Sequence, residues 1–323
     1  MKPWGHIDFI LDRTSEIEWS TINTVSFEPR SIETHSHIKA IKESINSTFI
    51  EFNYKNFING SDLEKRKIKI KEEFSISPKK EIQNSISDYN KKISEILEAS
   101  EKSIIFDITS APIEFTLTFI KRVISSDEIE NLLLSYTCTS LYQEKASVHE
   151  CDPPTAVPGF SILDETKRSN LKIDNYIGFG FTPANISSHL QEYTSSMTEI
   201  IIPFPSTPQS YRRNWKAAEL LTRGLSERPY FHRSHPYDIF GLYEYLNKKV
   251  SKSKNINIMI PIGPKPHAVA MALTHLSNPE KSEVWYPKPT KINPSTSKKI
   301  MINSNKKSEI LGYAIKLNGK PTL

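Results

Sequence analysis

The chain has 323 residues, of which 37% are hydrophobic and 24% charged, and its formal net charge is +5. These values exclude a disordered chain and leave room for two hydrophobic cores. The sequence has no apolar run near the roughly 18 residues of a membrane span, and acidic residues come too early at its start for a signal peptide. We therefore expect a cytoplasmic protein without membrane association.

Strand and helix patterns alternate through the first half of the chain. Strands are predicted at residues 23–27, 49–54, 103–108 and 132–137, and helices at 31–45, 88–99 and 113–124. The apolar run at 103–108 is typical of a buried parallel strand. We interpret residues 6–11 as an added edge strand and residues 56–83 as a charged insertion that forms an extra hairpin or helix.

The second half repeats this alternation after a proline-rich segment, 151–170, which we interpret as a linker. Strands are predicted at 176–181, 199–204, 257–262 and 283–286, and helices at 210–223, 238–250 and 267–276, with a further helix starting at 185. The segment RPYFHRSHPYD, residues 228–238, is interpreted as a loop, and 310–317 as a final strand. Such alternation implies parallel sheets with right-handed crossovers.

The carboxyl-terminal end holds most of the basic character. Residues 288–323 contain eight lysines and one acidic residue, so they carry +7 and the rest of the chain −2. A solvated lysine-rich end explains this pattern, and a contact with nucleic acid or an acidic partner is the alternative.

Two short motifs recur at one offset. The pattern F-x-P-x-x-I-x-x-H occurs at residues 27–35 and 181–189, and Ile108 and Pro112 match Ile262 and Pro266, each pair 154 residues apart. We therefore predict an α/β protein built from two tandem Rossmann-like halves, 1–150 and 171–300, related by internal duplication, with a basic strand and tail at 301–323. Two convergent strand-turn-helix units are the alternative.

The strand-to-helix turns are the candidate binding sites, because open parallel sheets bind ligands beyond the carboxyl ends of their strands. Gly263 permits close approach of the backbone, and Lys265 adds a cation at a helix start, which suits a phosphate or carboxylate. In the first half, Thr109 and Ser110 either cap the following helix or bond to a ribose, phosphate or metal. A rigid turn with a solvated lysine is the alternative for the second half.

A cationic cluster, Tyr211, Arg212 and Arg213, follows the strand at 199–204. Arginine pairs with phosphates in a bidentate manner, and aromatic rings stack on bases or on guanidinium groups. These three residues and Arg30 complete the predicted set of ligand-binding residues. A surface pair of arginines, and an ion pair between Arg30 and Glu28 or Asp107, are the alternatives.

Glu28, Asp107 and His35 are the candidate acids and bases should the protein be an enzyme. The spacing of the histidines does not indicate a metal site, and Cys138 and Cys151 are too few for a zinc quartet or a disulfide framework. No cofactor motif is present. We therefore name no metal and no cofactor.

The segments FEPRS, FDITSAPIEF, LLLSYT, VPGF, FPSTPQSYRRNW and IPIGPKPHAVAMAL together resemble an uncharacterised group of bacterial two-Rossmann proteins associated with anti-phage defence. The likeness covers roughly residues 20–300. More distantly, DITS and GPKP are similar to the D-x-T-G-G-T-K-type turn of CARF nucleotide-sensor domains, although DITS lacks the lysine and GPKP the threonines. The resemblance implies a nucleotide-sensing role in a defence system.

Three functions are compatible with these features. The first is a sensor or regulatory subunit that binds a nucleotide or another phosphate ligand. The second is a nucleotide-processing enzyme, a hydrolase or glycosidase. The third is a scaffold subunit for a protein effector, with the insertion at 56–83 and the basic tail as its candidate surfaces; the tail is also the candidate contact for nucleic acid.

Overall fold

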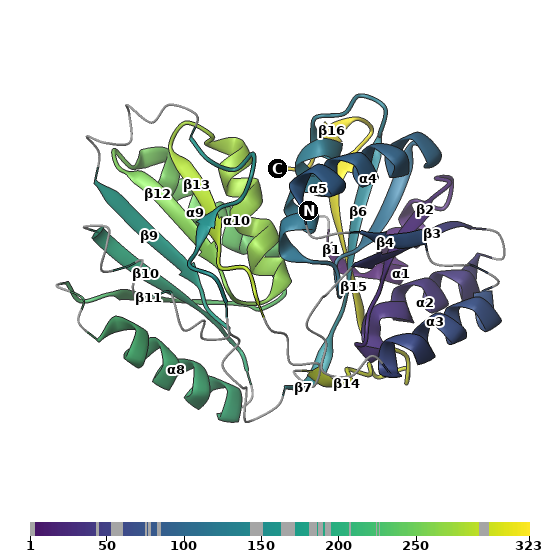
Figure 1. The fold of residues 1–323 in the computed structure, drawn as a ribbon, viewed down its shortest axis with the longest axis horizontal. Coiled ribbons are helices and arrows are strands. Elements are labelled where there is room, and N and C mark those ends of the chain that lie inside the picture. Colours follow the sequence, from purple (N-terminus) through teal and green to yellow (C-terminus); the bar gives the residue numbers. More distant parts are fainter. Residues whose placement is uncertain are drawn as a thin grey trace. The chain divides into compact units, whose positions relative to one another are not determined.

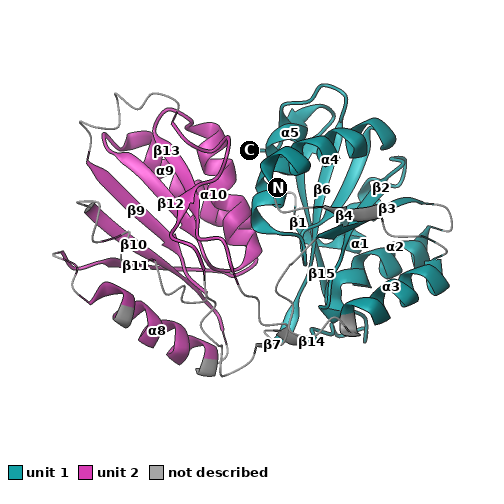
Figure 2. Ribbon diagram, viewed as in Figure 1, with its two compact units in different colours: residues 1–143, 294–323 teal, residues 144–293 magenta. Residues whose placement is uncertain are grey.

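The computed structural model describes residues 4–42, 45–52, 61–74, 76, 79–82, 85–142, 151–162, 172–180, 186, 190, 195–206, 208–223, 225, 227–290 and 297–323. The chain divides into two compact units (Figure 2). Unit 1 comprises Met1–Gln143 and Pro294–Leu323, and unit 2 comprises Glu144–Asn293. Each unit has its own sheet with helices on both faces (Figure 1), which is the α/β class predicted from the sequence.

The sheet of unit 1 has the order β1-β15-β6-β5-β2-β3-β4, with β16 paired to β15. Its strands are β1 Trp4–His6, β2 Ser20–Val25, β3 Asn46–Phe52, β4 Lys79–Ile82, β5 Ser103–Asp107, β6 Asn131–Thr137, β15 Ile310–Leu317 and β16 Lys320–Pro321. The five strands from β6 to β4 are parallel. Their chain order is the 3-2-1-4-5 order of a Rossmann sheet, and the order reverses between β2 and β5.

The helices of unit 1 are α1 Ile7–Arg13, the 3₁₀ helix η1 Pro29–Ile32, α2 Glu33–Ile41, α3 Ser61–Phe74, α4 Ile86–Ala99 and α5 Ile113–Ile124. They form where apolar residues recur at helical spacing. In α5, for example, Phe115 and Phe119 lie four residues apart, are fully buried, and pack their rings against Phe106 of β5. This contact fixes α5 to the strand whose end carries Asp107.

Unit 2 has a sheet of order β11-β10-β9-β12-β13-β8. Its strands are β8 Thr155–Ala156, β9 Ile173–Gly178, β10 Ser195–Pro203, β11 Tyr230–Ser234, β12 Ile256–Pro261 and β13 Ser282–Tyr286, and its helices are α8 Pro208–Thr222, α9 Ile239–Lys252 and α10 Lys265–Ser277. The strands from β11 to β13 are parallel and again follow the 3-2-1-4-5 order. A separate antiparallel pair joins β7 Thr139–Tyr142 and β14 Ser297–Ile300.

The offset of 154 residues relates equivalent strands of the two sheets. Adding it to the bounds of β2 and β5 gives those of β9 and β12 to within one residue. The shared strand order supports the duplication hypothesis, but unrelated chains also adopt this order, so duplication stays a hypothesis. Ile186, in the second copy of the repeated motif, is buried; Phe181, Pro183 and His189 of that copy lie outside the described residues.

Four expectations about elements need correction. Residues 6–11 are not an edge strand, because β1 ends at His6 and α1 follows at once. The segment 228–238 contains β11 and is not a loop throughout. The described part of 56–83 contains a helix, α3, as one of the two predicted forms, but α3 and β4 complete a parallel crossover from β3 and are not an insertion. The segment 151–170 is no simple linker, because β8 pairs with β13.

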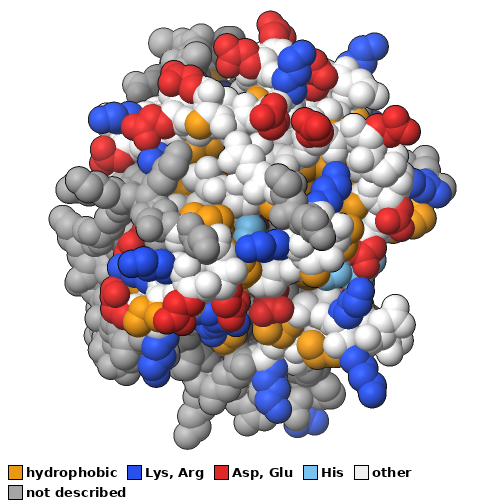
Figure 3. Space-filling model, turned by 90° about the vertical axis from the view of Figure 1, so that its right-hand side faces the viewer, with side chains coloured by type: hydrophobic (Ala, Val, Ile, Leu, Met, Phe, Trp, Pro, Cys, Tyr) orange, Lys and Arg blue, Asp and Glu red, His pale blue; other side chains and the backbone are white. Residues whose placement is uncertain are grey.

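The carboxyl-terminal end also differs from the predicted tail. The strand expected at 310–317 is present as β15, and it lies between β1 and β6 inside the sheet of unit 1. Residues 301–323 therefore belong to unit 1. The face of unit 1 in Figure 3 carries both basic and acidic side chains, rather than one sign of charge. In the described part of the chain, no helix is long and apolar enough to cross a membrane.

Candidate functional site

Five polar residues form one chain of hydrogen bonds at the carboxyl ends of β2, β5 and β6. The Arg30 guanidinium donates to the carbonyl of Thr137 (2.7 Å) and pairs with the carboxylate of Glu28 (2.6 Å). The N–H of Thr137 donates to the hydroxyl of Thr109 (2.9 Å), and both the hydroxyl and the N–H of Thr109 donate to Asp107. The structure thus brings together four of the predicted site residues.

This network joins the strand ends to one another, and its cation, the Arg30 guanidinium, is bound by protein groups within it. Arg30 is 5% exposed, and Asp107 and Thr109 are 1% exposed. Thr109 does not cap α5, whose amino-terminal cap is Pro112 without a side-chain bond. Ser110 is also buried, and its hydroxyl has no hydrogen-bond partner among the described residues. Ligand binding by these residues stays a prediction, and their bonds favour a structural role.

His35 lies apart from the other candidate acids and bases. Its Nδ1 bonds to the hydroxyls of Ser47 (3.2 Å) and Thr21 (3.5 Å), near the amino ends of β3 and β2. The rings of Phe49 and Phe74 pack edge-on against it. Burial, with a smaller contribution from the Lys39 charge, lowers the pKa of His35 to about 4. His35 is therefore a neutral core side chain at physiological pH.

Two glycines meet where the strand order of unit 2 reverses. A Cβ atom on Gly180 would lie 2.6 Å from the Cα of Gly263, and one on Gly263 would lie 2.6 Å from the carbonyl oxygen of Phe179. Only glycine therefore fits at either position. The sequence suggested that a ligand approaches the backbone closely at Gly263. In the structure, the close neighbour is the chain's own backbone at Phe179.

Lys265 is the first residue of α10, and His267 lies in the same turn. His267 is completely buried, and its Nε2–H donates to the carbonyl of His235 (3.1 Å). Burial outweighs the effect of this hydrogen bond and lowers the pKa of His267 to about 4. The imidazole is therefore neutral, so the cation at this helix start is Lys265.

The predicted cluster on α8 points to a different part of unit 2. Arg212 is exposed, and the ring of Tyr211 packs against Phe204 and Trp215. The Tyr211 hydroxyl accepts a hydrogen bond from Arg233 of β11 (3.2 Å). Tyr211 and Arg212 lie on α8, whereas Lys265 lies at the start of α10, and the joining of these cations into one site stays a prediction.

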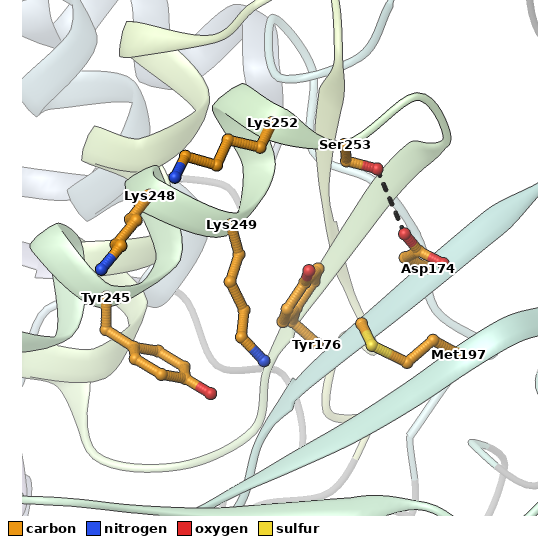
Figure 4. A pocket seen from close by; sticks show the side chains of 8 residues that line it. All are labelled: Asp174, Tyr176, Met197, Tyr245, Lys248, Lys249, Lys252 and Ser253. Carbon is orange, nitrogen blue, oxygen red and sulfur yellow. Dashed lines mark hydrogen bonds between the residues drawn. The ribbon is translucent and has the colours of Figure 1, made fainter.

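A pocket that the sequence analysis missed lies beside α9 in unit 2 (Figure 4). Its volume is about 550 Å³, within the range of small-molecule sites. The pocket is lined by residues of β9, β10 and the last two turns of α9 with the residue that follows: Asp174, Tyr176, Met197, Tyr245, Lys248, Lys249, Lys252 and Ser253. We call it the lysine pocket.

Both acidic groups at the lysine pocket are engaged by the protein itself. Asp174 accepts hydrogen bonds from Ser196 (2.7 Å), Asn255 (3.0 Å) and Ser253 (3.2 Å). Glu199, which is 2% exposed and lies on β10 next to the pocket, accepts from the ammonium of Lys249 (2.5 Å) and from the hydroxyl of Tyr245. The charge of Glu199 is therefore offset by Lys249, whereas Asp174 is held by three neutral donors.

In the lysine pocket, the polar groups without a partner among the described residues are hydrogen-bond donors. Lys248 and Lys252 lie four residues apart on α9, hence on one helix face, and neither ammonium has a partner in the described part of the chain. The hydroxyl of the buried Tyr176 also has none there. Burial first, then the carboxylates of Asp174 and Glu199, raises the pKa of Tyr176, so its phenol keeps the proton and can donate.

Lys249 has a different role from its two neighbours. Burial alone would lower its pKa, but the hydrogen bonds and charges of Glu199 and Tyr245 outweigh burial and raise it. Figure 4 shows its side chain extending between Tyr245 and Tyr176. Lys249 therefore neutralises Glu199 and holds the wall of the pocket.

The sequence rule for Rossmann sheets could not find this pocket. Asp174 and Tyr176 belong to the first four residues of β9, so the pocket lies toward the amino ends of the strands, away from the crevice where such sheets bind ligands. A signal was present in the lysines at 248, 249 and 252. Lysines near a helix end also suit the helix dipole, and the sequence alone does not separate the two explanations.

Comparisons with known proteins identify no relative. No family model matches the sequence, and no curated protein matches it. Two solved structures, a candidate universal stress protein from Pseudomonas aeruginosa UCBPP-PA14 and a protein of unknown function from Pseudomonas aeruginosa PAO1, each share 11% identity with a TM-score of 0.26. Each match covers 86% of this chain and 95% of the other.

A third structure, the cytoplasmic domain of a prokaryotic cation chloride cotransporter, shares 11% identity with a TM-score of 0.25, and the match covers 87% of this chain and 99% of that one. Likeness at this level carries no argument about function.

In the described residues, no three histidine, cysteine, aspartate or glutamate side chains gather as metal ligands would.

Proposed function

We propose that the protein binds a small phosphate-bearing ligand, such as a nucleotide, in the lysine pocket and acts as a sensor or regulatory subunit. The supporting observation is that every uncommitted polar group found at the pocket is a donor, two of them ammonium groups. Ammonium groups on one helix face repel each other unless an anion lies between them. Phosphate oxygens accept several charge-assisted hydrogen bonds at once.

The reaction chemistry of an enzyme receives no comparable support from the described residues. Glu28 and Asp107 are engaged in the network at the strand ends, and His35 is enclosed in the core. The association with anti-phage defence, the nucleotide-processing alternative and the effector-scaffold alternative stay predictions.

Isothermal titration calorimetry tests the proposal on the full chain. The panel is inorganic phosphate and the mono-, di- and triphosphates of adenosine and guanosine, with uncharged adenosine as the reference. We expect at least one phosphate compound to bind and adenosine to bind far more weakly. Replacing Lys248 and Lys252 together by alanine is expected to weaken binding at least about 100-fold, because hydrogen bonds to charged groups contribute roughly 1.5–3 kcal/mol each.

Two further variants sharpen the result. Tyr176→Phe removes only the hydroxyl, and a loss of about five-fold is expected, because a typical hydrogen bond contributes roughly 1 kcal/mol. Lys254→Ala is the matched control, because Lys254 is exposed two residues beyond Lys252 but does not line the pocket. If the panel fails to bind, or the double variant binds as well as the control, the proposal is wrong.

A further inference from the structure

Exposed aromatic rings gather on one surface of unit 2. Phe204, Trp215, Tyr230 and Phe231 are between 40% and 64% exposed. They come from the residue after β10, from α8 and from β11, which is an edge strand of the sheet. Trp215 and Phe231 are in contact, with ring centroids 4.9 Å apart. We call this the α8–β11 surface.

Arginine and lysine side chains accompany these rings. The Arg233 guanidinium lies 5.3 Å from the ring centre of Phe204 and 5.9 Å from that of Tyr211. Arg212 and Lys216 are exposed on α8. Residues 208–234 contain six basic and two acidic residues, so this segment has a formal charge of +4. The surface is thus positively charged as well as aromatic.

The geometry of the rings indicates the kind of partner. Tyr211 and Trp215 lie nearly parallel, at 21°, and Trp215 and Phe231 at 34°, whereas Phe204 meets Tyr211 edge-on. Trp215 and Phe231 are 44% and 40% exposed, which leaves ring surface open to a base. Proteins bind single-stranded nucleic acid with aromatic ring faces that lie next to cationic side chains. The bases stack on the rings, and the phosphates pair with the cations. Protein interfaces are also rich in aromatic residues and arginine, but they are depleted of lysine, and the exposed Lys216 favours a phosphate backbone.

We propose that the α8–β11 surface binds single-stranded nucleic acid, with bases on Trp215 and Phe231 and backbone phosphates on Arg212 and Arg233. The site is separate from the lysine pocket. Alternate residues of a strand point to opposite faces of the sheet. Phe231 contacts α8, whereas its neighbour His232 stacks on Tyr245 of α9, beside the lysine pocket.

Fluorescence anisotropy with a labelled 20-nucleotide oligothymidylate tests this on the full chain. We expect binding that weakens as salt increases. Trp215→Ala and Phe231→Ala are expected to weaken binding at least about five-fold each, as loss of a stacked base requires. Arg212→Glu, at an exposed position where a change of charge does not disturb the core, is expected to weaken binding at least about ten-fold and to flatten the salt dependence.

Phe9→Ala is the matched control, because Phe9 is 48% exposed in unit 1 and carries Arg13 over its ring at 4.1 Å. It is expected to bind like the wild type. Three results would overturn the proposal: no binding of the oligonucleotide, equal affinity for a duplex of the same length, or wild-type affinity in Arg212→Glu. Binding of an acidic protein to this surface without any oligonucleotide binding would also overturn it.

Discussion

Two of the buried histidines, His35 in unit 1 and His267 in unit 2, have lowered pKa values that make stability depend on pH. Each has a pKa of about 4 in the folded protein, below the ordinary histidine value of 6.5. Between these two pH values the imidazole is protonated in the unfolded chain but neutral in the folded protein. Their contribution is complete above pH 6.5 and is lost as the pH falls from 6.5 towards 4.

Urea unfolding at pH 7.5 and pH 5.5 measures this effect. We expect the free energy of unfolding to fall by about 1 kcal/mol per histidine over this interval. His267→Gln retains a donor for the His235 carbonyl and removes one titrating group, so its loss of stability between the two pH values is expected to be smaller by that amount. An unchanged loss in this variant would show that the imidazole titrates freely.

The glycines where β9 and β12 end give a second prediction at this scale. Gly263→Ala places a methyl group 2.6 Å from a backbone carbonyl, and the neighbours of Gly180 are equally close. We expect each alanine variant to lose about 1–3 kcal/mol of stability in thermal or urea unfolding. Gly5→Ala is the control, because a Cβ at Gly5 would meet no atom within 4 Å; comparable losses in all three variants would contradict the packing explanation.

Residue types in the sequence indicated polar clustering but not how the partners pair. Glu28, Arg30, Asp107 and Thr109 were all singled out, and the structure joins them. Their connection runs through the backbone of Thr137 on β6. A sequence does not reveal which carbonyl lies opposite an arginine. The same residue types therefore predict equally well a polar network with internal hydrogen bonds and an open binding site.

At the scale of elements, buried strands and amphipathic helices were predictable, and edges were not. Helix α5 has the predicted bounds, because its buried phenylalanines follow a clear helical period. Strand β11 was missed because an edge strand needs no continuous apolar run, and its residues Tyr230, Phe231 and Arg233 are exposed. The lysine pocket was missed for a related reason: its walls come from two strands and a helix far apart in the sequence.

Strand β15 supplies the prediction for this scale. It pairs with β6 on one side and β1 on the other, and its buried Lys316 donates to the carbonyls of Val123 and Ser126 at the end of α5. Truncation after residue 309 is therefore expected to abolish cooperative unfolding of unit 1 in circular dichroism and to make it sensitive to protease. A removable basic tail would leave both properties unchanged.

At the scale of the whole molecule, the parallel strands of the two units have the same order, but the units are built from different numbers of chain segments. Unit 2 is one continuous segment, whereas unit 1 needs residues from both ends of the chain. We expect a fragment of residues 144–293 to fold alone with a cooperative thermal transition. Residues 1–143 are expected to do so only when residues 294–323 are joined to them. Cooperative folding of 1–143 by itself would contradict this division.

The location of a bound phosphate tests the central claim most directly. A crystal structure of the full chain with the tightest ligand from the calorimetric panel should show phosphate density in the lysine pocket, in contact with the ammonium group of Lys248 or Lys252. Density at the start of α10 beside Lys265, or at the strand ends beside Ser110, would instead place the ligand where the fold rule predicted it and would contradict our assignment of the lysine pocket.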